Sequence, residues 1–581
     1  MVAESSYGAA EAEADAHIAY TDGGRNVAGG AAASPLTPTA AAAASASVWR
    51  RPLRRSVAAV AAMAMVTGSV ALVRTNSMGR AALAASSGLA ASESTPSPDS
   101  GLAVSNTNAA KAAAASSGCD GCPSVIMITL DDVGYNDLGY VSSDLPFVSP
   151  NLDQLAANGV KLTEYYGQSI CTPARTTLMS GKFVHRTGFN TQQGRIEIFP
   201  ISNYSVPLSH KLLPEYMQGA GYATHVIGKW NIGHCHQDYL PWNRGADTFL
   251  GYTGAGVTYD SHRAYGNASY PNPSTGGPTE LFDMLDGRSS DDWEPATSMR
   301  GAYTTHLFTE RAVEHVENHM ETESSSRPMF MWLAFHAAHD DPDAHPPTAD
   351  LPQYDVLMKM TGDEGLGHKR VMAALTLTDL DNSIGSLVAT MNTTGMLENS
   401  VIIVNSDNGG DPCGEHLVGD NHPLRGSKMT YFQGGLKVPG FIYSPNKAYI
   451  PHQARGTTYD GLMHHVDWVR TIYEGVVGRS LDDDGYDTST LDSLNHWQAI
   501  TADPDDPQFA DSDVRDNIIF ALTNHYMTVI KRVGGSDIKV MKNMFNSSWF
   551  GDAKETNNAM MCNQNMEFDE FNFMFNLTSD P

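Results

Sequence analysis

The segment CTPARTTLMSGKFVHRTG combines a cysteine, a proline and several basic side chains at short spacing. Cys171 lies two residues before Pro173 and four before Arg175, and Lys182 and His185 follow in the same segment. An intracellular enzyme can use such a cysteine as a nucleophile, whereas a secreted protein normally pairs its cysteines. A simpler interpretation is a buried cysteine at the start of a helix, with Pro173 in its first turn. Because the reactivity of a cysteine depends on its surroundings, the motif alone does not decide between these interpretations.

Polar side chains also end four short apolar runs that are typical of buried parallel strands. These runs are SVIMITLDD with Asp131 and Asp132, ATHVIGKW with Lys229, MFMWLAFHAAH with His336 and His339, and SVIIVNSDNGG with Asp407 and Asn408. Helical stretches lie between them, such as SPNLDQLAANGV, which begins with Ser-Pro and ends at a glycine. This alternation predicts an α/β fold with a large, mostly parallel sheet flanked by helices. Such sheets bind ligands at the carboxyl ends of their strands.

The residue types at these strand ends indicate a site for a metal and an anion. Carboxylates and an amide oxygen are hard ligands, which suit Ca²⁺ or Mg²⁺ and not zinc. An Asp-Asp pair alone is more often a solvated turn or a helix cap, so the metal hypothesis depends on the second pair, on another strand. Positive charge at the same edge would come from Arg175, Lys229 and Lys428. A divalent cation with these side chains forms a clamp for a tetrahedral oxyanion such as sulfate or phosphate.

Length and composition bound the rest of the chain. With 581 residues it can form one large domain and a smaller one. Residues 1–48 and 75–118 are rich in Ala, Ser, Gly, Thr and Pro, so we expect residues 1–118 to be disordered apart from a membrane signal. The formal net charge of −28 excludes nucleic acid as a partner, because its phosphates would be repelled.

The membrane signal is an uncharged run from Ser56 to Val73, preceded by Arg50, Arg51, Arg54 and Arg55. Its length just suffices to span a bilayer, and the arginines would keep the N-terminus in the cytoplasm. We favour a type II signal anchor at about 56–73 as the only membrane contact. A cleaved signal peptide ending near ALA at 82–84 is the runner-up, and an organelle transit peptide is third.

Glycosylation motifs agree with a lumenal location. The sequence contains five N-x-S/T sequons, at Asn203, Asn267, Asn392, Asn546 and Asn576. We therefore expect the folded part in the lumen of the secretory pathway, in a Golgi or lysosome-like compartment, or outside the cell.

Several motifs together resemble the sulfatases of the alkaline phosphatase superfamily, from about Pro123 to the C-terminus, with the arylsulfatase B-like branch nearest. The C-x-P-x-R signature is Cys171-Thr172-Pro173-Ala174-Arg175, followed by SGK where the family usually has T-G-R. Further matching blocks are GKW at 228–230, YLPWNRGADTFLGY at 239–252, SDNGG at 406–410 and PLRGSKMTYFQGGLKVPGFIYSP at 423–445. The number and order of these blocks make the resemblance specific.

The resemblance implies a function for the opening motif. In that family a formylglycine-generating enzyme oxidises the signature cysteine to formylglycine, so Cys171 would be a precursor and not a thiol nucleophile. One oxygen of the hydrated aldehyde, held on Ca²⁺, would attack the sulfur of a sulfate ester, and the expected substrate is a sulfated carbohydrate. The implied Ca²⁺ ligands are Asp131, Asp132, Asp407, Asn408 and modified Cys171.

The remaining implied roles concern the anion and the protons. Lys229 and Lys428 would hold the sulfate, Arg175 and His185 would support the hydrated aldehyde, and His339 would protonate the leaving alcohol.

One position departs from the family pattern. Relatives have G-K-W-H-x-G where this chain reads GKWNIG, so Asn231 replaces a histidine thought to act as a base. Asparagine forms hydrogen bonds but is no general base near neutral pH, although His234 or His336 could substitute. This replacement leaves open a catalytically impaired lumenal binding protein. A phospho- or phosphonate-ester hydrolase on the same fold also stays open, because sulfate and phosphate are both tetrahedral anions.

The domain hypothesis assigns residues 119–505 to the catalytic domain and 506–581 to a smaller one. By resemblance the smaller domain has an antiparallel sheet and a helix, and DNIIFALTNHYMTVIKRVGG supplies two strands of it. The sequence ends at FNLTSDP, where relatives continue, so we expect its last element to be missing.

The cysteines other than Cys171 are five in number, so at least one is free or bonded between chains. The CDGC motif at 119–122 has no second CxxC, which favours structural cysteines or a disulfide over a metal site.

Overall fold

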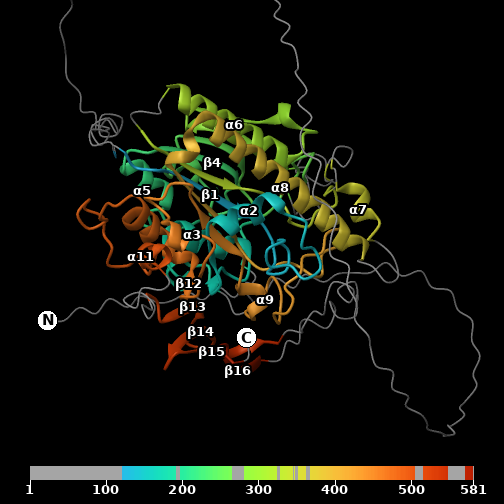
Figure 1. The fold of residues 1–581 in the computed structure, drawn as a ribbon, viewed down its shortest axis with the longest axis vertical. Helices are drawn as coiled ribbons and strands as arrows, with labels where there is room; N and C mark the ends of the chain where they lie inside the picture. Colours follow the sequence, from blue (N-terminus) through green and yellow to red (C-terminus); the bar gives the residue numbers. More distant parts are fainter. Residues whose placement is uncertain are drawn as a thin grey trace, which may run out of the picture. The chain divides into compact units, whose positions relative to one another are not determined.

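The central feature of the computed structural model is a ten-stranded mixed sheet in the order β11-β2-β10-β9-β1-β8-β4-β5-β6-β7 (Figure 1). The structure describes residues 119, 121–190, 196–264, 281–322, 327–344, 346, 351, 353–360, 367–503, 514–546 and 570–579. The five strands from β9 to β5 are mutually parallel, whereas β10, β6 and β7 run antiparallel to their neighbours. The predicted mostly parallel α/β fold is thus confirmed.

The four apolar runs of the sequence form four neighbouring strands at the centre of this sheet. Their bounds are β1 Ser124–Leu130, β4 Ala223–Lys229, β8 Met329–Ala334 and β9 Ser400–Ser406. The outer strands are β2 Val160–Leu162, β5 Thr248–Tyr252, β6 Leu285–Ser289, β7 Asp292–Pro295, β10 Gly440–Tyr443 and β11 Thr458–Tyr459. A two-stranded pair is formed by β3 Tyr165–Tyr166 and β12 Met463–His464.

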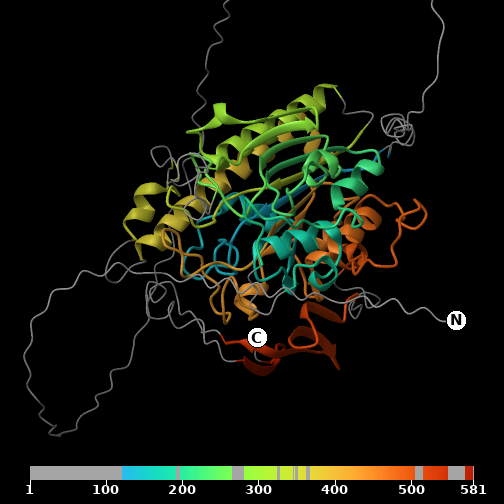
Figure 2. The ribbon, with the colours of Figure 1, turned by 180° about the vertical axis from the view of Figure 1, so that it is seen from behind.

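Helices cover both faces of the large sheet (Figure 1, Figure 2). Alternate residues of β1 point to opposite faces, so Ile126 and Ile128 belong to one hydrophobic core while Val125 and Met127 belong to the other. The first core packs against α2 Pro150–Asn158, α6 Thr304–Thr322, α7 Tyr354–Met358 and α8 His368–Thr394. The second packs against α3 Cys171–Ser180, α5 Leu213–Gly219, α10 Trp468–Arg470 and α11 Trp497–Thr501. The short α4 Val184–Thr187 and α9 Gln433–Leu436 complete the α-helices of the described residues.

Both ends of α2 follow the sequence pattern. Pro150 begins the helix directly after Ser149, and Gly159 follows its last residue. Proline fits the first turn because its missing N–H would have no partner inside the helix.

An antiparallel sheet of four strands lies near the C-terminus, in the order β13-β14-β15-β16. Its strands are β13 Asn517–Leu522, β14 Met527–Val533, β15 Ser536–Phe545 and β16 Glu570–Asn576. The first two are the strands predicted from the sequence. Ile518, Phe520 and Ile530 pack with Tyr166 and Phe432 in a third hydrophobic core. The predicted helix beside this sheet is not among described residues 514–546 and 570–579.

The described cysteines answer part of the cysteine prediction. Cys119 and Cys122 form a disulfide, which confirms the structural interpretation of CDGC. Cys413 is also disulfide-bonded, and Cys235 is free and exposed.

The predicted signal anchor at about 56–73 lies outside the described residues. Within those residues, none of the helices has both the length and the apolar composition that a bilayer crossing requires.

Candidate active site

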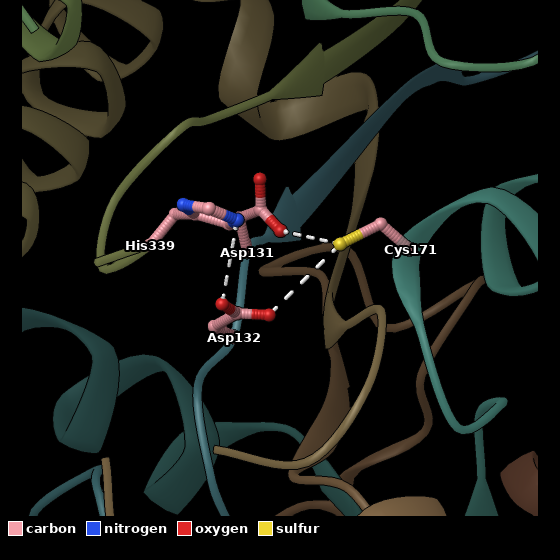
Figure 3. A group of neighbouring side chains, drawn as sticks. All are labelled: Asp131, Asp132, Cys171 and His339. Carbon is pink, nitrogen blue, oxygen red and sulfur yellow. Dashed lines mark hydrogen bonds and ion pairs between the residues drawn. The ribbon is translucent and has the colours of Figure 1, made fainter. Parts of the chain in front are cut away.

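The carboxyl ends of β9, β1, β8 and β4 meet at one edge of the sheet and bring the predicted polar residues together. Asp131 and Asp132 follow β1, Lys229 ends β4, His339 follows β8, and Asp407 follows β9. Figure 3 shows Asp131, Asp132 and His339 around Cys171, which begins α3. Four separate stretches of sequence thus meet because their strands are neighbours.

In each of the two adjacent aspartates, one carboxylate oxygen contacts a lysine and the other contacts Cys171. Asp131 Oδ2 accepts a hydrogen bond from Lys229 Nζ at 2.7 Å, and Asp132 Oδ2 accepts one from Lys428 Nζ at 2.5 Å. The Oδ1 atoms instead face Cys171 Sγ, at 3.3 Å from Asp131 and 3.9 Å from Asp132 (Figure 3). Each carboxylate therefore keeps one oxygen on a lysine and directs the other toward residue 171.

Arg175 connects three elements of the site. Its Nε and Nη2 donate to Asp407 Oδ2 at 3.0 and 2.8 Å, and its Nη1 donates to the carbonyl of Lys229 at 2.8 Å. Burial and the nearby carboxylate of Asp131 raise the pKa of Asp407 to about 6, although Arg175 opposes the rise. The arginine therefore holds the ends of β4 and β9 against α3 and stabilises the charge of Asp407.

Lys428 and His339 form a hydrogen-bonded pair beside Asp132. Lys428 Nζ lies 3.2 Å from His339 Nε2, and His339 Nδ1 lies 3.0 Å from the carbonyl of Asp340. Because a carbonyl only accepts, Nδ1 carries the proton and Nε2 accepts from Lys428. Burial, together with Lys428, lowers the pKa of His339 to about 3. Burial alone would raise the pKa of Asp132, but Lys428 holds it well below its usual range.

Cys171 is the first residue of α3 and is buried, as the simpler interpretation of its motif predicted. Burial and the carboxylate of Asp131 raise the pKa of its thiol well above the ordinary value. A thiol in these surroundings stays protonated and is a poor nucleophile. The site therefore does not favour Cys171 acting as a thiolate.

The charges around Cys171 suit a bound cation and an anion. Three buried carboxylates, those of Asp131, Asp132 and Asp407, balance three buried cations. Ligand atoms of Asp131, Asp132, Cys171 and His339 all lie within 4.8 Å of one another. Asn408 Oδ1 is buried and has no hydrogen-bond partner among the described residues, while its Nδ2 donates to Asp132 Oδ1 at 2.7 Å. A divalent cation would use these oxygens and leave positive charge for an anionic substrate to neutralise.

Three residues at the site have left-handed backbone conformations that are uncommon for residues other than glycine. Their φ angles are 59° at Asp132, 50° at Asn231 and 68° at Met429, which follows Lys428. Such conformations persist where the surrounding contacts fix them, and they concentrate at functional sites.

The other histidines of the sequence prediction have their described contacts elsewhere. His185 stacks on Phe183. Burial lowers the pKa of His185, although the nearby carboxylate of Asp492 opposes this shift. His234 has both ring nitrogens near carbonyl oxygens, those of Thr253 at 3.3 Å and Pro200 at 3.1 Å. Among the described residues, none of these contacts reaches Cys171.

His336 is fully buried and stacks on Tyr259 with ring centroids 4.2 Å apart. Burial, with His339 next, lowers the pKa of His336 well below its ordinary value. Neither of its ring nitrogens has a hydrogen-bond partner among the described residues.

The sequence analysis missed a buried acid next to the motif. Glu197 accepts a hydrogen bond from the backbone N–H of Thr172 at 3.0 Å, and its other carboxyl oxygen lies 2.8 Å from the Thr172 hydroxyl. It therefore contacts the residue that follows Cys171. A charged residue within the otherwise apolar IEIF run was the available signal.

Comparison with known proteins adds an independent description. Residues 123–476, more than half of the chain, match the family model described as Sulfatase. Mouse arylsulfatase J is 33% identical over 369 residues, which cover 63% of this chain and 55% of that protein. Mouse N-acetylgalactosamine-6-sulfatase is 27% identical over 329 residues, covering 56% of this chain and 57% of that protein. The chain thus spans little more than half the length of these curated relatives.

A solved structure shares the fold. The crystal structure of Ps i-CgsB in complex with k-i-k-neocarrahexaose superposes with a TM-score of 0.58 at 22% identity, covering 79% of this chain and 87% of that chain.

Proposed function

The chain belongs to the sulfatase family, and on this premise we propose that it hydrolyses sulfate esters with a nucleophile made by oxidation of Cys171 to formylglycine. The observation that carries the proposal is the position of Cys171. Its side chain faces one oxygen each of Asp131 and Asp132, within a ring of buried lysines and an arginine. A protonated, buried thiol would contribute little there, whereas a residue that gains oxygen by modification would fit the charges around it.

Ca²⁺ is the cation that the oxygen donors suit best. Asp131, Asp132, Asp407, Asn408 and modified Cys171 would hold it, since hard carboxylate and amide oxygens are its preferred ligands. Bound there, the cation would supply stabilisation of the negative charge on the sulfate, and the hydrated aldehyde would supply an oxygen nucleophile.

The side chains around residue 171 have separable tasks. Lys229 and Lys428, each bonded to an aspartate, bind the sulfate oxygens when the substrate enters. Arg175 keeps Asp407 charged and in place. His339 Nε2 carries no proton of its own, so a proton for the leaving alcohol would come from Lys428, which donates to Nε2, and pass through the ring to the alcohol oxygen. His185 stays a hypothesis for the support of the hydrated aldehyde.

We propose a sulfated carbohydrate as the substrate class. The name of the mouse relative, N-acetylgalactosamine-6-sulfatase, supports this, as it denotes a sulfated sugar. Exposed aromatic residues also support it: Phe199 and Tyr204 lie in the segment that follows Glu197, which contacts Thr172. Sugar rings stack favourably on such side chains.

The oxidation of Cys171 also implies a partner enzyme and a cellular location. Oxidation of Cys171 requires the formylglycine-generating enzyme, so the chain would pass through the secretory pathway to a lumenal compartment or the cell exterior. Asn203 and Asn392 are exposed and open to glycosylation there.

The central test measures residue 171 itself. Mass spectrometry of the peptide that contains residue 171, from protein made in eukaryotic cells, is expected to show formylglycine in place of cysteine. Cys171→Ala should remove nearly all turnover of an aryl sulfate and leave the unfolding transition in place, because only the nucleophile is lost. Unmodified cysteine in an active preparation would contradict the proposal.

The choice of substrate separates the rival functions. The purified protein should hydrolyse an aryl sulfate faster than an aryl phosphate at equal concentration; the reverse order would assign it to phosphoester hydrolysis. Formylglycine and bound Ca²⁺ without any turnover would assign it to binding, for which Asn231 in place of the family histidine is the motivating feature.

A further inference from the structure

A small hydrogen-bond cluster surrounds Thr172, the residue that follows Cys171. It consists of Thr172, Glu197, Ile198 and Asn231. Thr172 N donates to Glu197 Oε1 at 3.0 Å, and Ile198 N donates to Thr172 Oγ1 at 3.0 Å. Thr172 Oγ1 also lies 2.8 Å from Glu197 Oε2 and 2.7 Å from Asn231 Oδ1. Asn231 Nδ2 donates to the carbonyl of Ile198 at 3.3 Å.

The hydrogens available to this cluster determine the charge of Glu197. The Thr172 hydroxyl has one hydrogen and two lone pairs. If Glu197 were ionised, its Oε2 and Asn231 Oδ1 would both be acceptors, and the single hydroxyl hydrogen could serve only one of them. If Glu197 is a neutral acid, Oε2–H donates to Thr172 Oγ1, and the hydroxyl donates to Asn231 Oδ1. Every short contact then contains a hydrogen.

Rotation of the Asn231 amide would accommodate an ionised Glu197 only by breaking the hydrogen bond between Asn231 and Ile198. With the amide turned over, Nδ2 would donate to Thr172, and the hydroxyl would be free to donate to a charged Glu197. Asn231 Oδ1 would then face the carbonyl oxygen of Ile198, at the position where Nδ2 now donates at 3.3 Å. Two buried acceptors would then face each other without a hydrogen between them, which is unfavourable because neither can bond to water.

The surroundings of Glu197 agree with a neutral acid. Its side chain is only 7% exposed, and burial raises its pKa. Lys229 and Lys428 are the charged groups that oppose this rise, but each donates to an aspartate instead. Tyr204 also faces this segment, but its hydroxyl donates to the backbone carbonyl of Glu197 and not to the carboxyl group.

We propose that Glu197 is held as a neutral carboxylic acid and acts as a positioning residue, which fixes Asn231 through the hydroxyl of Thr172. The acid proton allows Thr172 to donate to Asn231, and this bond helps to hold Asn231 at its φ of 50°. The position at which relatives carry a histidine is thereby part of an uncharged network. The protonation state of Glu197 is inferred from the hydrogen bonds of the cluster. The effect of this state on turnover rests on the proposed function.

The test compares Glu197→Gln with Glu164→Gln, both measured without substrate. Glutamine reproduces the neutral acid, because its NH₂ donates to Thr172 Oγ1 and its oxygen accepts from Thr172 N. Glu164 is a matched control: it accepts from Tyr166 and forms an ion pair with Lys437 at 2.7 Å. We expect Glu164→Gln to lower the folding equilibrium constant near neutral pH. Glu197→Gln should leave this constant unchanged or increase it.

The pH dependence gives a signature that packing alone would not produce. An acid whose folded-state pKa is raised stabilises the protein fully below the unfolded pKa of about 4.3, and this stabilisation is lost as pH rises through the folded value. Relative to the Glu197→Gln variant, the wild-type protein should therefore lose up to about tenfold in its folding equilibrium constant per pH unit across that window. The Glu164→Gln variant should keep the wild-type dependence in this window.

Infrared difference spectra supply the second measurement. The carbonyl band of a protonated carboxylic acid should be present in the wild-type protein near neutral pH and missing from Glu197→Gln. The proposal is overturned if this band is absent, if the pH dependence is the same in both proteins, or if Glu197→Gln fails to fold. Because neither measurement involves sulfate hydrolysis, failure here is distinct from failure of the proposed function.

Discussion

At the scale of single residues, Lys428 is the side chain whose removal should most directly weaken anion binding. Its ammonium group is 2.5 Å from Asp132 Oδ2 and donates to His339. Lys428→Met removes a positive charge from the proposed sulfate site and raises the pKa of Asp132, which Lys428 lowers. We expect kcat/KM for an aryl sulfate to fall by ~10²–10³-fold, as for loss of one preorganised charged group.

Lys437→Met is the matched control for Lys428. Lys437 is also buried and pairs with a carboxylate, that of Glu164, but it lies outside the active-site cluster. Its substitution should reduce stability and leave kcat/KM close to the wild-type value. Equal losses of kcat/KM in both variants would show that Lys428 has only a structural role.

Asn231 carries a second prediction at this scale. Its left-handed φ of 50° is a conformation that asparagine and histidine both adopt more readily than most residues. The side chain is fully buried and bonded to Thr172 and Ile198, so it supplies hydrogen bonds but no base. We expect a burst of alcohol followed by slow steady turnover in the wild-type protein, since loss of a base costs ~10²–10⁴-fold.

Asn231→His should raise the steady rate in stopped-flow assays and leave the burst amplitude nearly unchanged. Absence of a burst in the wild-type protein, with no gain from the histidine, would mean that another group accepts the proton.

At the scale of elements, the loop after β1 depends on a buried charge network. Asp137 accepts from the N–H of Gly134 at 2.6 Å and from that of Asp420 at 3.0 Å, and it pairs with Arg370 of α8. Arg370 also bonds Asp144 at 3.0 Å. Arg370→Leu leaves two acids without their cation, which should cost ~3–5 kcal/mol of unfolding free energy.

The pH dependence identifies the mechanism of this loss. Burial raises the pKa of Asp137 to about 6, although Arg370 lowers it, so removal of the arginine should raise it further. The destabilisation by Arg370→Leu should therefore be smaller at acid pH, where Asp137 is protonated, and larger near neutral pH. Urea denaturation at both pH values measures this, with the exposed pair of Arg288 and Asp292 as control. A loss that does not change with pH would exclude Asp137 as its cause.

At the scale of the whole molecule, a lysine of the C-terminal sheet contacts helix α9 and has no acidic partner among the described residues. Lys539 of β15 is 1% exposed, and its Nζ donates to Gln433 Oε1 of α9 at 2.9 Å. Burial lowers its pKa well below the ordinary value. The unfolded chain, with a lysine pKa of about 10.4, therefore binds a proton that the folded protein does not.

It follows that Lys539 makes the protein more stable as pH rises toward about 10. Lys539→Met should increase the free energy of unfolding most at lower pH, and the gain should shrink as pH rises. Denaturation across this range is the measurement, with Lys531→Met as control, because Lys531 is exposed and paired with Asp516. A destabilised Lys539→Met variant would show that the hydrogen bond to Gln433 outweighs the cost of burial.

Much of the active site could be predicted from the sequence. Asp131, Asp132, Lys229, His339 and Asp407 stand at the ends of apolar runs, and buried parallel strands necessarily read as such runs. Since the carboxyl ends of parallel strands meet at one edge of a sheet, their convergence followed from the pattern alone. The sequence by itself therefore determined the type of fold, the edge that carries the site and most of its charged residues.

Only the tertiary structure decided which of these groups touch. The sheet order β9-β1-β8-β4 differs from chain order, and it depends on packing across the whole domain. That order directs Arg175 to Asp407 and to the carbonyl of Lys229, and the loop after β9 brings Lys428 to Asp132. Glu197 was unpredicted because its role depends on a hydrogen-bond partner 25 residues earlier in the chain. Contacts between loops of different strands leave no periodic trace in the sequence, so the proton on Glu197 could be inferred only from the distances between its neighbours.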